Sequence, residues 1–150
     1  MRLRTGSFVY SRTRLTYVSG YAYQRRFLEK KYRGPATASH LWDRPELKDA
    51  TYPVGTKITD HFEILGHTED SIIIRAGDSP KNLEPRASDG LIELKTEIKK
   101  DEGVAEFQFK CVFYQGVGQA EGPVMPWHVE KLHQWYSKLL TETAVRTLLR

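Results

Sequence analysis

Four polar side chains occupy places in this chain where the surrounding pattern favours apolar residues: Asp60, Arg75, Tyr114 and His133. A carboxylate such as Asp60, held beside apolar walls, has a raised pKa and can act as a general acid or base. Arg75 closes an apolar run and can bind a carboxylate or an enolate. Tyr114 can donate a hydrogen bond to a carbonyl, and the imidazole of His133 titrates near neutral pH. These residue types predict acid–base chemistry that needs no cofactor.

Each of these residues also has a purely structural interpretation. Asp60 can end a strand and pair with a backbone amide or a basic side chain, and Arg75 can form a salt bridge with Asp78 or Asp89. Tyr114 can simply pack at an edge of the sheet. A single histidine on a helix often lies on the surface or hydrogen-bonded in the core. Both interpretations remain open at this point.

Several other chemistries have no support in the sequence. His128 and His133 are five residues apart, which does not align them on a helix, and the single Cys111 offers no zinc-binding pair. The sequence has no nucleophile elbow of the Gly-x-Ser-x-Gly type. Cys111 lies mid-strand among phenylalanines, and we expect its thiol to be packed in the core. The glycines of segment 116–122 do not have dinucleotide-binding spacing. We therefore expect no metal and no cofactor.

The elements that must position these residues are clearest in the second half of the chain. Residues 91–99 and 104–115 alternate between apolar and polar side chains and are joined by a short polar turn that ends at Gly103, which predicts a β-hairpin. Segments 56–66 and 71–76 predict two further strands. Residues 127–149 predict one helix about 35 Å long.

An apolar stripe on this last helix is expected to cover the sheet. The stripe consists of Leu132, Trp135, Tyr136, Leu139, Leu140, Thr143 and Leu148. Aromatic residues of the strands and of the helix are the predicted ligand-contacting residues: Phe62, Phe107, Phe109, Phe113, Trp135 and Tyr136. On the expected first strand face, Asp60 lies together with Ile58 and Ile64.

The order of these elements over residues 54–149 resembles the second half of the helix-grip fold of the START and polyketide-cyclase-like superfamily. Local similarities are Val54-Gly55 before a strand, and Pro126 with His128 at the start of the terminal helix. The resemblance implies an α+β domain in which a curved antiparallel sheet wraps around a long C-terminal helix and encloses an apolar cavity. Members of that superfamily bind lipids, sterols or polyketides, and some catalyse cyclisation, aldol or dehydration steps.

Charge divides the chain into a basic segment, 1–33, and the remaining domain, 34–150. The first segment carries nine of the 23 basic residues and one of the 19 acidic residues, a net charge of +8, whereas the rest carries −4. We expect residues 7–18 to form a strand and 21–33 a helix, although an Arg-rich, acid-poor beginning also resembles a mitochondrial transit peptide or a nucleic-acid-binding arm. The acidic remainder argues against general nucleic-acid binding.

The function expected from the sequence is binding of a small apolar or polyketide-like metabolite, with acid–base cyclisation, isomerisation or dehydration as the accompanying reaction. A non-catalytic carrier of the same ligand class is the alternative, followed by an RNA- or partner-binding module that uses residues 1–33. No apolar run reaches the roughly 20 residues that cross a bilayer. A single cysteine suits a reducing compartment, so a cytoplasmic location is expected, with a mitochondrial one as the alternative. A homodimer is left open.

Overall fold

The β5–β6 hairpin contributes the two longest strands of the sheet, in agreement with its long apolar–polar alternation. In the computed structural model, which describes residues 8–9, 19–119 and 121–148, β5 spans Ser88–Lys99 and β6 spans Val104–Gln115. The strands are antiparallel and pair along their whole length. Gly103 ends the connecting turn with φ +66°, a left-handed conformation that glycine adopts without strain. The predicted hairpin is confirmed.

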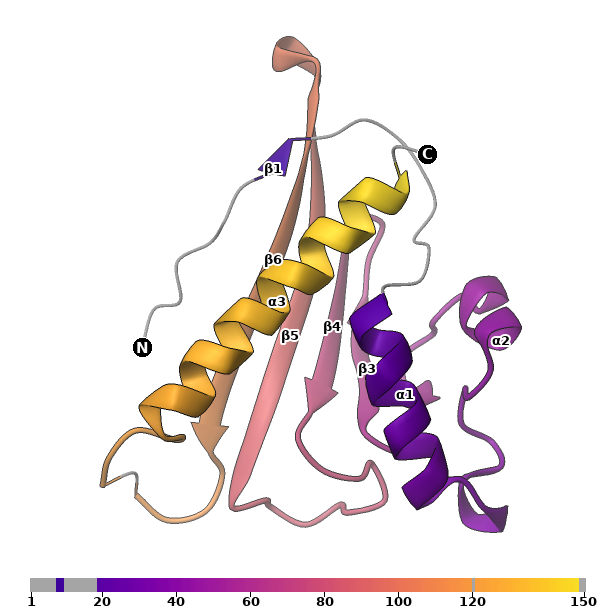
Figure 1. Ribbon diagram of the computed structural model, residues 1–150, viewed down its shortest axis with the longest axis vertical. Coiled ribbons are helices and arrows are strands. Elements are labelled where there is room, and N and C mark those ends of the chain that lie inside the picture. The colour runs from indigo at the N-terminus through magenta and orange to yellow at the C-terminus, as the bar shows by residue number, and fades with distance from the viewer. Residues whose placement is uncertain (1–7, 10–18, 120, 149–150) are drawn as a thin grey trace.

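Within the described residues the sheet has six antiparallel strands in the order β1-β6-β5-β4-β3-β2 (Figure 1). The four outer strands are short: β1 (Phe8–Val9), β2 (Lys57–Ile58), β3 (Phe62–His67) and β4 (Ser71–Ala76). The chain is therefore an α+β protein with an antiparallel sheet, as expected. Of the expected first strand, 7–18, the structure describes only Phe8–Val9, and the other residues lie outside the described ones.

One strand prediction is wrong in detail. Segment 56–66 is not a continuous strand, because Thr59–His61 form a turn between β2 and β3. Ile58 and Phe62, on either side of this turn, are direct cross-strand partners. Asp60 therefore lies in a turn and not on a strand face.

The pairing register separates an apolar front face of the sheet from a polar back face. Ile74, Ile92 and Cys111 are aligned across three neighbouring strands on the front face. The back face carries cross-strand ion pairs such as Lys110 with Glu93, whose Nζ and Oε2 atoms are 2.8 Å apart. An antiparallel sheet with one apolar and one polar face packs on one side and faces water on the other. The predicted strand phenylalanines, Phe62, Phe107, Phe109 and Phe113, are half-buried on the front face.

Helices α3 (Trp127–Leu148) and α1 (Ser19–Tyr32) both lie on the front face, and α3 crosses it diagonally (Figure 1). The Tyr136 hydroxyl donates a hydrogen bond to Oε1 of Gln24, at 2.9 Å, which joins the two helices. The short helix α2 (Arg44–Asp49) lies at the side, beyond α1. Among the described residues, the helices are too short or too polar to span a membrane.

The rotation of α3 about its axis differs from the expected one. Leu132, Trp135 and Leu139 of the predicted stripe are exposed, whereas Thr141 and Val145 are buried. This rotation agrees with the hydrogen bond from Tyr136 to α1, and it turns His133, Ser137 and Thr141 toward the sheet instead of Leu132, Trp135 and Leu139. Trp135 consequently faces away from the sheet and does not contact a ligand held against it.

A second packed region surrounds Trp42 at the side of the sheet. The indole is almost fully buried, and its Nε1 donates to the carbonyl oxygen of Thr37 at 2.9 Å. Arg25 of α1 donates to the carbonyl oxygen of Trp42, and Arg33 pairs with Asp43. Two of the basic residues in segment 1–33 thus bind elements of the remaining chain.

Candidate functional site

The space between α3 and the front face of the sheet contains His133. Its imidazole meets the ring of Phe113 edge to face, with ring centroids 4.7 Å apart and an interplanar angle of 81°. Gly90 lies opposite Phe113 on β5, where a Cβ atom would come within 3.1 Å of this phenyl ring. A glycine at this position therefore allows the ring to lie across β5.

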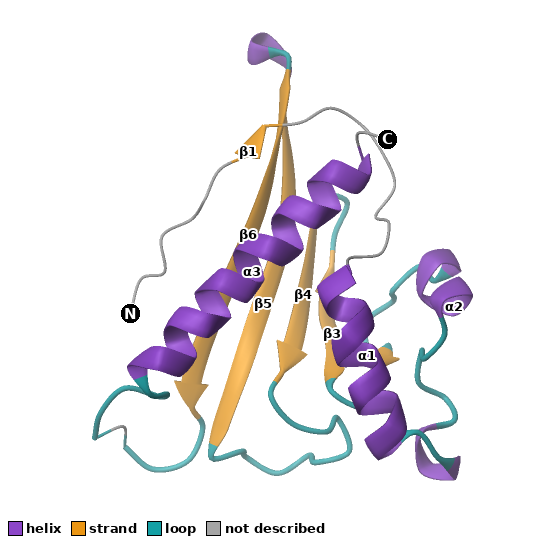
Figure 2. Cartoon of the chain, viewed as in Figure 1, coloured by secondary structure: helices purple, strands orange, loops and turns teal. Residues whose placement is uncertain are grey.

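A cavity of about 100 Å³ adjoins His133 at the end of the sheet where β6 leads into α3. Its walls come from β6, from the following loop and from the first turns of α3: Cys111, Val112, Phe113, Pro123, Val124, Met125, Glu130, His133 and Gln134. The loop 77–87 and the described loop residues 116–119 and 121–126 lie at this same end of the sheet (Figure 2). The cavity is mostly apolar, with the imidazole and the Glu130 carboxylate as its titratable groups besides the thiol.

Two buried polar atoms on the inner face of α3 have no hydrogen-bond partner among the described residues: Nε2 of His133 and Oγ of Ser137. The two residues are one helical turn apart and therefore point in the same direction. Buried polar atoms of proteins are almost always paired, so two unpaired ones side by side suggest a site for a polar group of another molecule.

Burial governs the titration of this site. It lowers the pKa of His133 below the ordinary 6.5, so the imidazole is neutral at pH 7 and can both donate and accept a hydrogen bond. It raises the pKa of the Cys111 thiol to about 11. Burial also raises the pKa of Tyr136, whose hydroxyl stays protonated and donates to α1.

A separate polar cluster forms around Asp60. Thr59 and Asp60 have φ values of +50° and +51°, which non-glycine residues adopt at a cost. This turn directs the buried Asp60 carboxylate inward, where Oδ1 accepts a hydrogen bond from the Ser79 hydroxyl at 2.9 Å. The same Oδ1 lies 3.6 Å from Nδ1 of His40 and 4.0 Å from Nζ of Lys81. Burial lowers the pKa of His40, against the opposing charge of Asp60.

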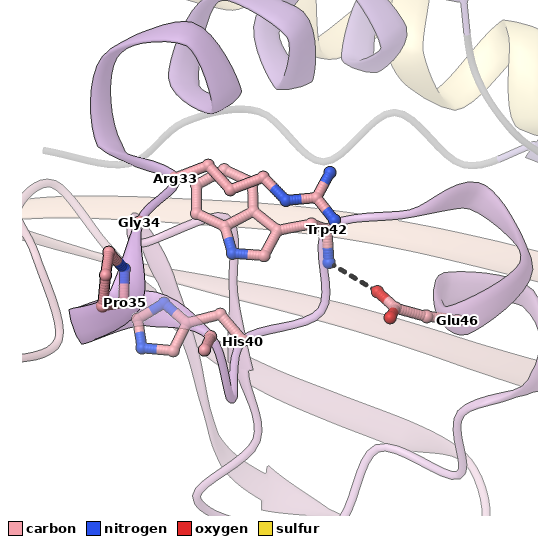
Figure 3. Close-up of a pocket in the computed structure, with 7 residues that line it drawn as sticks. Arg33, Gly34, Pro35, His40, Trp42 and Glu46 are labelled. Atoms are coloured by element: carbon pink, nitrogen blue, oxygen red, sulfur yellow. Dashed lines mark hydrogen bonds between the residues drawn. The ribbon is translucent and has the colours of Figure 1, made fainter.

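An open hollow of about 340 Å³ lies beside His40, and Arg33, Gly34, Pro35, Ala38, Trp42 and Glu46 also line it (Figure 3). The charged groups at this hollow are already engaged in the fold. Glu46 accepts a hydrogen bond from the backbone amide of Trp42 at 2.9 Å, and Arg33 pairs with Glu29 and Asp43. Asp60 is not part of its wall, and the hollow therefore offers little free recognition chemistry besides His40.

Arg75 belongs to a buried ion network, which agrees with its structural interpretation. Its Nε donates to Oδ2 of Asp89 at 2.6 Å, and the buried Arg86 lies 3.4 Å from Oδ1 of the same carboxylate. Arg86 also donates to the carbonyl oxygens of Ser79 and Asn82, so the network holds the 77–87 loop against the sheet. Hydrogen bonding to Asp89 raises the pKa of Arg75.

The four residues predicted to do chemistry do not meet in one cavity. His133 lies under α3 on the front face, and Asp60 lies in the β2–β3 turn. Arg75 lies at the back of the sheet beside Asp89, which is the cross-strand partner of Tyr114. The acid–base arrangement that combined all four is therefore not present, and His133 alone keeps a place at the α3 cavity.

Sequence reasoning missed Ser137 and Glu130, and it missed His40 and Ser79, which both contact Asp60. Ser137 and Glu130 could have been predicted to lie beside His133, because they are four residues after it and three residues before it on one helix. His40 and Ser79 are distant in sequence and are brought to the same carboxylate only by the turn at Asp60.

No group of three or more possible metal ligands occurs in the part of the chain that the structure describes. Comparisons with protein-family models, with curated proteins and with solved structures find no match.

Proposed function

We propose that this domain binds a small molecule with an apolar body and one hydrogen-bonding group in the space between α3 and the front face of the sheet. The observation that carries the proposal is the unpaired buried Nε2 of His133, which lines a largely apolar cavity, together with the unpaired Oγ of Ser137 one helical turn farther along α3. A hydroxyl or carbonyl of the ligand would satisfy them, which is worth about 1–3 kcal/mol per group.

The apolar part of the ligand would lie along the half-buried front face. A cavity of about 100 Å³ holds only a few atoms, whereas drug-sized ligands occupy roughly 300 Å³ or more. Phe107, Phe109 and Ile92 on the front face are only half-buried, so apolar surface remains for a longer molecule to cover. Each apolar group of side-chain size that the ligand buries there contributes about 1.5–3 kcal/mol to the free energy of binding.

The element order supports, as part of this proposal, the helix-grip architecture in which a sheet wraps around the terminal helix. Resemblance to that fold concerns residues 54–149, and the structure has strands, hairpin and terminal helix in this order. Lipid and polyketide ligands of the helix-grip superfamily have the apolar body that this site would accept. Fold similarity alone does not choose a ligand.

Acid–base turnover is the second candidate function, because catalysis needs at least two titratable groups at one cavity. Glu130 and His133 line the same cavity from one helix face. The neutral imidazole can take a proton from a ligand carbon or oxygen, and the carboxylate can stabilise the resulting imidazolium. Isomerisation, cyclisation and dehydration are reactions of this kind. Without turnover, the domain acts as a carrier.

Displacement of a fluorescent probe tests the binding site. The probe is 1-anilinonaphthalene-8-sulfonate, displaced by octan-1-ol, which has an apolar chain and one hydroxyl. We expect saturable displacement for the wild type and at least tenfold weaker binding for Cys111→Phe, which fills the cavity. Ile73→Phe is the matched control, because Ile73 lies on the exposed back of β4. Equal affinity of all three proteins would refute the site.

A further inference from the structure

The outer face of α3 carries large apolar side chains that nothing in the described chain covers. Trp127, Leu132, Trp135 and Leu139 have exposed fractions of 74%, 71%, 78% and 51%. Leu132, Trp135 and Leu139 follow the i, i+3, i+7 spacing of one helix face. Exposed apolar patches with two tryptophans are typical of interaction surfaces, where tryptophan contributes most of the binding energy.

Charged residues on this outer face are placed symmetrically. Lys131 and Glu142 are eleven residues apart, which is three helical turns or about 16 Å. Trp127 and Arg146 lie farther out on either side and have the same midpoint, between Tyr136 and Ser137. Leu132 and Leu139 are also symmetric about this part of the helix, to within one residue.

We propose that two copies of this chain associate through the outer faces of their α3 helices, packed antiparallel about a two-fold axis near the middle of the helix. The axis places Lys131 of each copy against the partner's Glu142, and Trp127 against the partner's Arg146 for a cation–π contact. Glu142 already receives Arg146 of its own helix at 2.5 Å and is exposed enough to accept a second cation.

The positions of the charges favour a second copy over an anionic lipid surface. A lipid-binding helix carries basic residues beside its apolar face, and Lys131 and Lys138 fit that description. Glu142 does not fit a lipid-binding helix, because its carboxylate would face the anionic headgroups. In the antiparallel pair the same carboxylate meets a lysine. The inner face of α3, with His133, stays directed at its own sheet, so the proposed ligand site is retained in the dimer.

Charge reversal combined with sedimentation equilibrium tests this interface. We expect the wild type to dimerise with rising concentration, and Lys131→Glu and Glu142→Lys each to raise the dissociation constant at least tenfold. The double variant Lys131→Glu with Glu142→Lys restores the two ion pairs and should recover most of the affinity. Lys100→Glu is the control, because it makes the same charge change in the exposed turn between β5 and β6, away from α3.

Trp135→Ser provides a second variant, which removes apolar area without changing charge and should also be monomeric. All these side chains are exposed, so circular dichroism and melting temperature should be those of the wild type. A wild type that remains monomeric at millimolar concentration overturns the proposal. So does a dimer that Trp135→Ser leaves intact, or an outer face that binds phosphatidylserine vesicles while the protein stays monomeric.

Discussion

Replacing His133 with phenylalanine should stabilise the free protein while abolishing ligand binding. The buried Nε2 has no partner among the described residues, and an unsatisfied buried polar group costs about 1–3 kcal/mol. Phenylalanine removes this atom, keeps the edge-to-face contact with Phe113, and has room for its extra ring atom in the adjoining cavity of about 100 Å³. We therefore expect the free energy of unfolding to rise by about 1–3 kcal/mol.

Urea denaturation and calorimetry at pH 7.5 measure this change. A protein of this length gains roughly 2–4 °C in melting temperature per kcal/mol, so the variant should melt about 2–12 °C higher. His128→Phe, in the exposed first turn of the same helix, should stay within about 0.5 kcal/mol of the wild type. A loss of more than about 1 kcal/mol in the His133 variant would mean that the imidazole is satisfied inside the protein, and the reasoning would fail.

Three further changes are predicted. Asp89→Ala should lower the free energy of unfolding by about 3–5 kcal/mol in urea, because it leaves Arg86 buried without its carboxylate; a loss below 1 kcal/mol would show that the network is not needed. Stability should fall as the pH drops through about 6.5. Burial lowers the pKa of His40, His61 and His133 in the folded chain, so the unfolded chain binds more protons below the ordinary value of 6.5; the variant with all three replaced by glutamine should flatten this slope in calorimetry between pH 7.5 and 5.5. Cys111 should react with a disulfide reagent at pH 8 at least about 100-fold more slowly than in the urea-unfolded chain, since its pKa of about 11 leaves little thiolate; equal rates would contradict its burial.

The hairpin and the terminal helix could be predicted from the sequence because each has a single strong period. Residues 105–111 alternate strictly and residues 92–98 do so except at Thr96, and a one-residue slip would turn the front-face phenylalanines of β6 outward. The predicted helix 127–149 is seen as Trp127–Leu148. Pattern strength of this kind specifies both the type and the extent of an element.

The turn at Asp60 could not be predicted, because it leaves the alternation intact. Ile58 and Phe62 lie on either side of a three-residue turn and become cross-strand partners, so they share a face just as they would in one straight strand. Thr59 and Asp60 also adopt left-handed conformations, and neither is a glycine, which is the residue that usually indicates such a conformation in a sequence. As a result, the contacts of Asp60 with His40 and Ser79 leave no mark in the sequence.

The rotation of α3 was ambiguous for a different reason. Apolar residues occur on both sides of this helix, so hydrophobic period alone allows either Leu132 and Trp135 or Leu140 and Val145 to face the sheet. Long-range contacts distinguish between them, including the hydrogen bond from Tyr136 to Gln24 of α1 and the ring contact of His133 with Phe113. In the structure, polar side chains such as His133, Ser137 and Thr141 share the inside of α3 with Val145, and Leu132, Trp135 and Leu139 lie outside.

The proposed ligand site can be tested most directly on the His133 imidazole itself. With ¹⁵N-histidine-labelled protein, the Nε2 resonance of His133 should shift saturably on addition of octan-1-ol, as the nitrogen gains its missing hydrogen-bond partner. The His128 resonance, from the exposed first turn, should stay in place. A His133 resonance that does not move at octan-1-ol concentrations that displace the fluorescent probe would contradict the assignment of this site.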